Sequence, residues 1–267
     1  MVRNILLSTV MGLLSGITAL SSHAADHDTF RAALAAGDPA RLSALIEANQ
    51  RRLPADAEGV TVLHRALHVY SANQLEMVRR LIAAGADVNA ATREGATPLH
   101  WAGRFRVEAA VPLLLAAGAR VDARDEDGAT PLFFAGAQMA TLLIAAGADP
   151  LVRDREGNVP LHRNPQAELL APGVNVRNSA GLTPLHYAAL GGNIPGIEWL
   201  LSQGADAKAR TTTATHWRSA IVSKSFGPGE PVPAHATALD LAQARHQQTR
   251  FNTGRYREVV EALKKAR

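Results

Sequence analysis

The chain of 267 residues contains no cysteine. This absence excludes disulfide scaffolds, zinc sites built on cysteine, thiol nucleophiles and lipid anchors attached to cysteine. Aromatic residues make up only 4% of the sequence, whereas apolar residues make up 47%. A composition rich in alanine and leucine and poor in aromatics suits thin, closely packed helices better than a β-sandwich. The length is sufficient for a sizeable core, in one elongated domain or two compact ones.

Recognised catalytic and nucleotide-binding motifs are also missing. The sequence has no G-x-S-x-G, no Walker A loop, no H-E-x-x-H and no dinucleotide fingerprint. Serine, histidine and aspartate are present, but no pattern brings them together as a catalytic group. We therefore expect a non-enzymatic protein with no metal site and no cofactor.

The formal net charge of +4 is mild for this length. Arg3 contributes one of these charges, so removal of an N-terminal leader would leave +3. This excess is too small to predict nucleic-acid binding. From Asp206 to Arg267, eleven Lys and Arg residues face five acidic residues. That basic end is either a solvated face that closes the fold or a surface that attracts an acidic partner.

The first 24 residues have the pattern of a secretory signal peptide. Arg3 precedes an apolar stretch from Ile5 to Leu20, and small residues follow up to Ala24. The stretch is shorter than the ~20 apolar residues of a membrane anchor and is interrupted by polar residues. We expect cleavage after Ala24, a periplasmic or secreted location, and no membrane insertion of the mature chain. A bacterial periplasm fits a chain without cysteine.

Two short motifs recur along the chain. Thr-Pro-Leu-His begins at Thr97 and at Thr183, with looser copies at 61, 130 and 159. The second motif, an apolar stretch ending in Gly-Ala, has its glycine at 85, 118, 147 and 204. The glycine before each copy of the first motif lies at 59, 95, 128, 157 and 181, so the spacings are 36, 33, 29 and 24. Such periods indicate stacked repeats.

This pattern resembles the ankyrin repeat, which has a period of about 33 residues and the signature T-P-L-H-x-A. The resemblance implies an all-α fold, an ankyrin-repeat α-solenoid of helix–turn–helix units joined by β-turn or hairpin loops. We expect about six to seven units, including degenerate caps. The boundaries follow the pattern: 1–24 signal peptide, 25–58 N-terminal capping repeat, 59–210 ankyrin repeats, 211–235 long inserted loop, and 236–267 C-terminal capping repeat.

The residues themselves explain the helical hairpins. Thr97 is a good N-cap, and Pro98 needs no amide partner in the first turn. One helix pair cannot bury its own apolar face, but a stack of pairs buries a continuous core. The resemblance implies that the motif histidine bonds backbone groups between neighbouring repeats. The two full copies of this structural repeat motif are Thr97, Pro98, Leu99, His100, Thr183, Pro184, Leu185 and His186.

The repeats are irregular at several places. The repeat from Thr61 is three residues longer than 33, with the excess expected near residues 70–73. The repeat from Thr130 is four residues short, and the one from Val159 is nine short, which leaves only stubs of helix. After Gly204, 21 extra residues precede Thr237. Long insertions are usually functional or disordered, and in repeat proteins they often lie on the binding face.

Resemblance to ankyrin proteins implies a protein partner held on the concave face of the solenoid, by loop tips and by the exposed side of the first helices. The candidates are Trp101, Arg104, Phe105, Arg106, Phe134, Tyr187, Arg93, Glu94, Asp125, Glu126, Asp154 and Arg155, with Trp217 and Arg218 on the inserted loop. Aromatic residues and arginine often anchor interfaces. The alternative is that Trp101, Phe134 and Tyr187 only pack between repeats.

These observations favour a monomeric periplasmic scaffold that regulates or protects a protein partner. An alternative is an immunity-type inhibitor of a toxin or effector delivered to the periplasm. A third hypothesis is an enzyme with a site in the notch at Val159–Gly181, which would require Asp154, Glu156, His162 and Glu168 to cluster.

Overall fold

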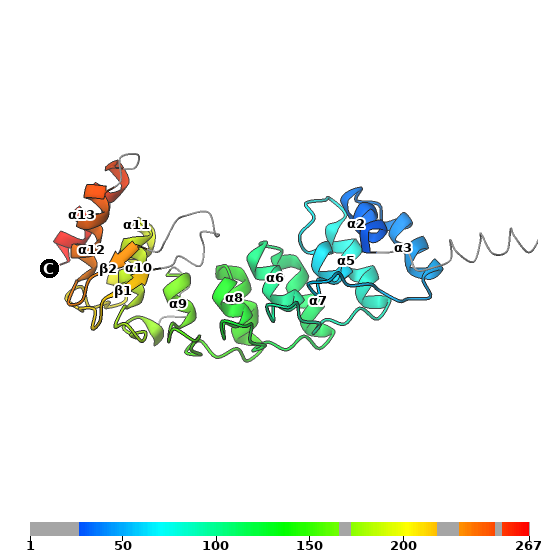
Figure 1. The fold of residues 1–267 in the computed structure, drawn as a ribbon, viewed down its shortest axis with the longest axis horizontal. Helices are drawn as coiled ribbons and strands as arrows, with labels where there is room; N and C mark the ends of the chain where they lie inside the picture. The colour runs from blue at the N-terminus through cyan, green and yellow to red at the C-terminus, as the bar shows by residue number, and fades with distance from the viewer. Residues whose placement is uncertain (1–26, 166–171, 218–229, 249–252, 267) are drawn as a thin grey trace, which may run out of the picture. The chain divides into compact units, whose positions relative to one another are not determined.

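The structure is a computed structural model that describes residues 27–165, 172–217, 230–248 and 253–266 (Figure 1). The expected signal peptide, 1–24, lies outside the described residues. The chain divides into two compact units, Met1–Arg93 and Glu94–Arg267. None of the helices in the described ranges has both the length and the apolar character needed to span a lipid bilayer.

The first unit contains two stacked helix pairs. Helices α2 (His27–Ala35) and α3 (Pro39–Ala48) form one pair, and α4 (Val62–Ala66) and α5 (Gln74–Ala83) form the other. Helix α2 packs on α4, and α3 packs on α5, so the apolar faces of the two pairs cover each other. The largest fully buried side chains of this unit are Phe30, Leu34, Leu42, Leu63, Leu67, Met77 and Leu81.

The second unit continues the same arrangement. Its elements are α6 (Pro98–Arg104), the 3-10 turn η1 (Glu108–Ala110), α7 (Val111–Ala116), the 3-10 turn η2 (Pro131–Phe134), α8 (Ala137–Ala145), α9 (Pro160–Arg163), α10 (Pro184–Leu190), α11 (Ile194–Ser202), the strands β1 (Thr215–Trp217) and β2 (Glu230–Val232), α12 (Ala238–Gln248) and α13 (Thr253–Lys265). Successive first helices pack on each other, α6 on η2, η2 on α9, α9 on α10 and α10 on α12. The described residues thus hold six helix pairs and the short α9, in agreement with the expected number of about six to seven helical units.

The first helices begin where the sequence predicts. Thr61, Thr97 and Thr183 are N-caps of extended conformation, and the histidine three residues later completes a capping box with each of them. Gly103 allows close packing in the next layer, because a Cβ at this position would lie 3.1 Å from the Cβ of Phe134. Short helices with small residues therefore stack closely enough to exclude water from their shared faces.

The motif histidines connect neighbouring repeats. His100 Nδ1 accepts a hydrogen bond from the Thr97 amide at 3.1 Å, and its Nε2 lies 3.1 Å from the Ala129 carbonyl in the following repeat. A carbonyl can only accept, so Nε2 carries the proton. His162 makes the same contact with the Leu182 carbonyl, also at 3.1 Å. This histidine bridge is the structural role that the resemblance implies.

His186 forms the last bridge of this kind in the described residues, to the Ala236 carbonyl at 3.2 Å. Burial lowers the pKa of His100, His162 and His186 to about 4, because a charged imidazolium would lose its hydration. In the unfolded chain these rings titrate near pH ~6.5. Between these two pH values the unfolded chain binds more protons than the folded chain. The contribution of the three rings to the free energy of unfolding is therefore fully present above pH ~6.5 and falls as the pH drops toward 4.

We expect the thermal midpoint of the full chain to fall by about 5 °C or more between pH 7 and pH 5. Differential scanning calorimetry at several pH values measures this change. The variant His162→Gln should lower the midpoint at pH 7 and flatten its pH dependence, whereas His68→Gln, at an exposed position, should follow the parent curve. An NMR titration that gave the three bridging rings pKa values near 6.5 would contradict the explanation.

The repeat from Thr130 lacks this bridge because Phe133 stands at the histidine position. The Thr130 hydroxyl is buried without a hydrogen-bond partner. The four missing residues shorten the first helix to the 3-10 turn η2, while the second helix α8 keeps nine residues. Phe133 packs instead with Ala129 and Val152, so apolar contact replaces a polar connection at this layer.

A second set of contacts runs through the loops of this unit. The Nη1 of Arg124 donates to the Arg153 carbonyl at 2.9 Å, and Arg153 repeats the contact with the Arg177 carbonyl at 2.9 Å. Arg177 bonds the Arg210 carbonyl and Arg210 bonds the His235 carbonyl, each at 2.7 Å. We call these contacts the arginine ladder. Its steps span 29, 24, 33 and 25 residues, so the connection between layers is kept whatever the length of the repeat.

The inserted segment after Arg210 is closed at its base by backbone pairing. The Thr211 amide donates to the Ala236 carbonyl at 3.0 Å, and the His235 amide donates to the Thr211 carbonyl at 3.0 Å. The buried Thr211 hydroxyl donates to the Pro233 carbonyl at 2.7 Å and accepts from the Ala236 amide at 3.0 Å. Thr211 thus holds both ends of the insertion together.

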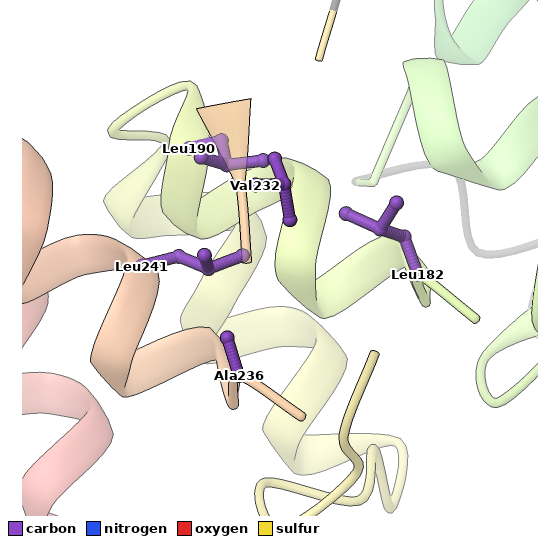
Figure 2. Close-up of a cluster of buried hydrophobic side chains, with 5 residues drawn as sticks. All are labelled: Leu182, Leu190, Val232, Ala236 and Leu241. Carbon is purple, nitrogen blue, oxygen red and sulfur yellow. The ribbon is translucent and has the colours of Figure 1, made fainter. Parts of the chain in front are cut away.

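Above this base, β1 and β2 pair antiparallel, with Thr215 opposite Val232. Val232 is buried in an apolar cluster with Leu182, Leu190, Ala236 and Leu241. Figure 2 shows Val232 of β2 beside Leu190 of α10, with Leu241 of α12 nearby. The insertion is therefore anchored as a hairpin on the last layers of helices. Residues 218–229, including Arg218, lie outside the described residues.

Replacement of Thr211 by valine should lower the free energy of unfolding by about 1–3 kcal/mol, because the buried Ala236 amide loses its acceptor. The shape of the side chain is unchanged, so the loss reports the hydrogen bonds. Chemical denaturation of the two chains measures the difference. Thr212→Val is the matched control, since Thr212 is exposed and should change stability by less than ~0.5 kcal/mol. Equal effects of both changes would contradict the role of Thr211.

Candidate functional site

The residue that follows the motif histidine takes the same place in successive repeats of the second unit. This position holds Trp101 on α6, Phe134 on η2, Arg163 on α9 and Tyr187 on α10. All four side chains are partly buried, whereas the residue that precedes each of them is buried. The first three of these residues line one hollow.

The hollow lies between loop tips and first helices and has a cavity volume of about 140 Å³. Its lining residues are Glu94, Ala96, His100, Trp101, Arg104, Asp125, Glu126, Asp127, Phe134 and Arg163. Trp101 and Phe134 contribute aromatic rings to this lining, and the loops contribute its acidic residues. The loops that carry these charges are joined by a hydrogen bond from the Glu126 amide to the Glu94 carbonyl at 2.8 Å.

Arg163 closes one side of the hollow. Its guanidinium carbon lies 5.2 Å from the ring centre of Phe133 and 5.5 Å from that of Phe134, within the range of cation–π attraction. Its Nη2 lies 3.3 Å from Oδ2 of Asp154, and the two side chains are only 12% and 2% exposed. Arg163 is therefore held in a fixed place by a buried ion pair and two aromatic rings.

A polar network supports this ion pair. Asp154 accepts hydrogen bonds from the Asn158 amide at 2.9 Å and from Asn158 Nδ2 at 3.0 Å. The Tyr187 hydroxyl donates to Asn158 Oδ1 at 2.9 Å, and the Tyr187 ring packs edge-on against His162 at 5.2 Å. Burial raises the pKa of Tyr187 far above its usual value. Tyr187 and Asp154 thus serve the structure of the layer.

The loop tips contribute four acidic residues to the lining of the hollow. Asp125 is half-buried and accepts hydrogen bonds from the Asp127 amide at 3.0 Å and the Ala129 amide at 2.8 Å. Burial raises the pKa of Asp125. Glu94, Glu126 and Asp127 are exposed, and none of them forms an ion pair with another residue that the structure describes.

The structure thus places six of the predicted partner-binding residues around one hollow: Glu94, Trp101, Arg104, Asp125, Glu126 and Phe134. Phe105 lies beside it, because its ring packs against Trp101 at 5.2 Å. Arg93 bonds the Ala57 carbonyl within the first unit at 3.3 Å.

The other predicted residues lie elsewhere. The Arg106 side chain lies against Gly136, and Arg155 is exposed while its amide bonds the Asp127 carbonyl at 2.9 Å. Trp217 lies in β1, and Arg218 is outside the described residues.

Sequence reasoning missed Arg163, Asp127 and Ala96 as residues of the hollow, and it gave His100 only a structural role. Arg163 has a usable signal, because it occupies the same repeat position as Trp101. The shortness of its repeat suggests a degraded helix, and α9 is indeed only four residues long. Asp127 adjoins the predicted Glu126, and its place in the hollow follows from the turn geometry of the loop.

In the notch that the enzyme hypothesis requires, the His162 and Asp154 side chains are already engaged in hydrogen bonds or an ion pair. His162 accepts from the Val159 amide at 3.1 Å and donates to the Leu182 carbonyl, so neither ring nitrogen is open to a substrate. Asp154 is bound by Arg163 and Asn158, and Glu168 lies outside the described residues. Among the residues that the structure describes, no group of three His, Asp or Glu side chains could hold a metal ion.

Replacement of Arg163 by methionine should destabilise the chain by about 3 kcal/mol, because the Asp154 carboxylate stays buried without its cation. The double variant D154N/R163M should lose less than the two single changes added together, since it removes both charges. Urea unfolding of the four chains gives this coupling. Arg155→Met changes an exposed arginine and should be nearly neutral. Additivity of the two single changes would contradict a stabilising pair.

Comparisons with known proteins agree with the repeat pattern. The family model described as Ankyrin repeats (3 copies) matches residues 29–125, 67–154 and 111–211, which together span more than half of the chain. A search of curated proteins gave no match. One similar solved structure is the crystal structure of the ankyrin repeat domain of Bcl-3, described as a unique member of the IkappaB protein family. It is 24% identical with a TM-score of 0.56, and the match covers 88% of this chain and 97% of that one.

The similarity to the Bcl-3 structure shows the fold of this chain. The match to the family model shows the family to which it belongs. Ankyrin repeats indicate a protein–protein interaction scaffold. The all-α class expected from the sequence is confirmed, with the β-hairpin of the insertion as an addition to it. The chain belongs to the ankyrin-repeat family.

Proposed function

We propose that this chain is a non-enzymatic binding protein that acts in the periplasm, where it regulates or protects a protein partner. The observation that carries the proposal is the hollow around Trp101. Its lining combines the partly exposed Trp101 and Phe134 with charged loop residues, whereas at the equivalent position Tyr187 is engaged in a hydrogen bond with Asn158. Aromatic residues and arginine in a partly enclosed site are typical anchors of protein interfaces.

The proposal assigns the partner contact to one side of the helices and to the loop tips. Trp101 and Arg104 lie one turn apart on α6 and present an aromatic ring and a cation to the hollow. The anchored hairpin of the insertion adds a second contact region, since insertions in repeat proteins often lie on the binding face. The location rests on the signal-peptide pattern of residues 1–24.

The double variant W101A/R104A should weaken partner capture at least tenfold, because it removes both the aromatic anchor and its neighbouring cation. Its thermal midpoint should stay within about 2 °C of the parent, since Arg104 is exposed and Trp101 is partly exposed. The mature chain serves as bait in periplasmic extract, captured proteins are identified by mass spectrometry, and affinity for the purified partner is then measured.

The variant W199A/R257A is the matched control, because it removes a tryptophan and an arginine that do not line the hollow. It should capture the partner as the parent does. A large fall in the midpoint of W101A/R104A would show that these residues are core, and unchanged capture would refute the site. Capture of a toxin or effector would identify an inhibitor of the immunity type, and capture of a resident enzyme would identify a regulator or protector.

A further inference from the structure

We infer that the hollow around Trp101 accepts a basic side chain of the partner, an arginine or a lysine in an exposed segment. This inference rests on the proposed function and names the chemistry that the same site recognises. Three sets of observations on the described residues support it: the balance of charge in the lining, the cation that the lining already holds, and the size of the hollow with the exposure of its aromatic residues.

The balance of charge favours a cation. Glu94, Glu126 and Asp127 are exposed lining residues without an ion pair among the described residues, and the half-buried Asp125 also lines the hollow. Arg104 is the exposed cation in the lining. Arg163 is balanced by its own partner, Asp154, at 3.3 Å. The lining therefore keeps an excess of negative charge that a basic side chain would complement.

The protein already places one guanidinium in this environment. Arg163 lies against the Phe134 ring and is paired with a carboxylate, which shows that aromatic rings and acidic groups here hold a cation with little exposure. Trp101 lines the same hollow and stands near the carboxylates of the loop tips. A partner cation on Trp101 would repeat this arrangement with a better aromatic acceptor, because tryptophan gives the strongest cation–π attraction.

The aromatic residues of the lining also fit a flat, partly apolar group. Trp101 is partly exposed and is held by the Phe105 ring at 5.2 Å, and the buried His100 ring is fixed by its bridge to Ala129. The cavity volume of about 140 Å³ suits a single long side chain and is too small for a helix. A guanidinium group can stack on an indole ring while it donates hydrogen bonds to carboxylates around it.

The test uses the full chain and three short synthetic probes. The probes are acetyl-Gly-Ser-Arg-Ser-Gly-amide, the same peptide with citrulline, which is neutral and has nearly the shape of arginine, and the same peptide with glutamate. Each probe is titrated to millimolar concentration while the Trp101 indole N–H resonance is followed by NMR. The W101F spectrum identifies this resonance.

We expect the arginine probe to shift the Trp101 resonance with saturation, and to bind at least fivefold more tightly than the citrulline and glutamate probes. The triple variant E94Q/E126Q/D127N should weaken the arginine probe at least fivefold. The control E47Q/E198Q/E258Q, which neutralises three exposed acids on helices that contribute no residue to the lining, should leave it unchanged. Equal binding of the citrulline probe, tighter binding of the glutamate probe, no saturable shift, or insensitivity to the first triple variant would each overturn the inference.

The same triple variant separates this inference from the proposed function. With the captured protein as ligand, E94Q/E126Q/D127N should bind at least tenfold more weakly than the parent. If it binds as the parent does while W101A/R104A does not, the basic side chain is refuted and the binding site stands. If both variants bind as the parent does, the site itself is refuted as well.

Discussion

The hydrogen bond from a histidine ring to a carbonyl of the following repeat is the contact on which the arrangement of the second unit depends. One ring nitrogen receives the amide of the N-cap, and the other reaches the next layer, as His100 does with Ala129. Both bonds are buried, so water cannot replace them without opening the stack. The ring thereby fixes how far apart two layers lie and also forms part of the wall of the hollow. Trp101, the next residue, is positioned by the same helical turn.

The place where this contact is missing adjoins the candidate site. The Phe133 ring has no donor for a hydrogen bond to a carbonyl, and the Thr130 hydroxyl is buried without a hydrogen-bond partner. The layer is held instead by the Arg163–Asp154 pair, by the aromatic rings beneath the guanidinium, and by a hydrogen bond from Asn164 to the Ala135 carbonyl. A local departure from the repeat pattern that is compensated in this way is characteristic of functional sites. It supplies the hollow with an aromatic ring and a fixed charge.

Local rules explain how far the sequence could be interpreted. Thr97, Pro98 and Asp38 act within one helical turn, so their positions alone predict where helices begin. The period of the motifs predicts the stack, because it reports burial of one face of each hairpin. Arg124 and Arg153 look like ordinary loop charges in the sequence, since their carbonyl partners are 29 and 24 residues away. Arg163 belongs to a repeat so short that only its three-dimensional surroundings reveal its contacts.

The hydrogen bonds of Thr211 join the two ends of the insertion, so the repeats on either side do not depend on the residues between those ends. The two ends of the segment lie within hydrogen-bond distance of each other. The last contact of the arginine ladder is accepted by the His235 carbonyl, at a position where the preceding repeats have an arginine. The neighbouring helices therefore make the same contacts whether the inserted segment is short or long. The sequence between the two ends can therefore change without altering the hydrogen bonds that join this segment to the helices.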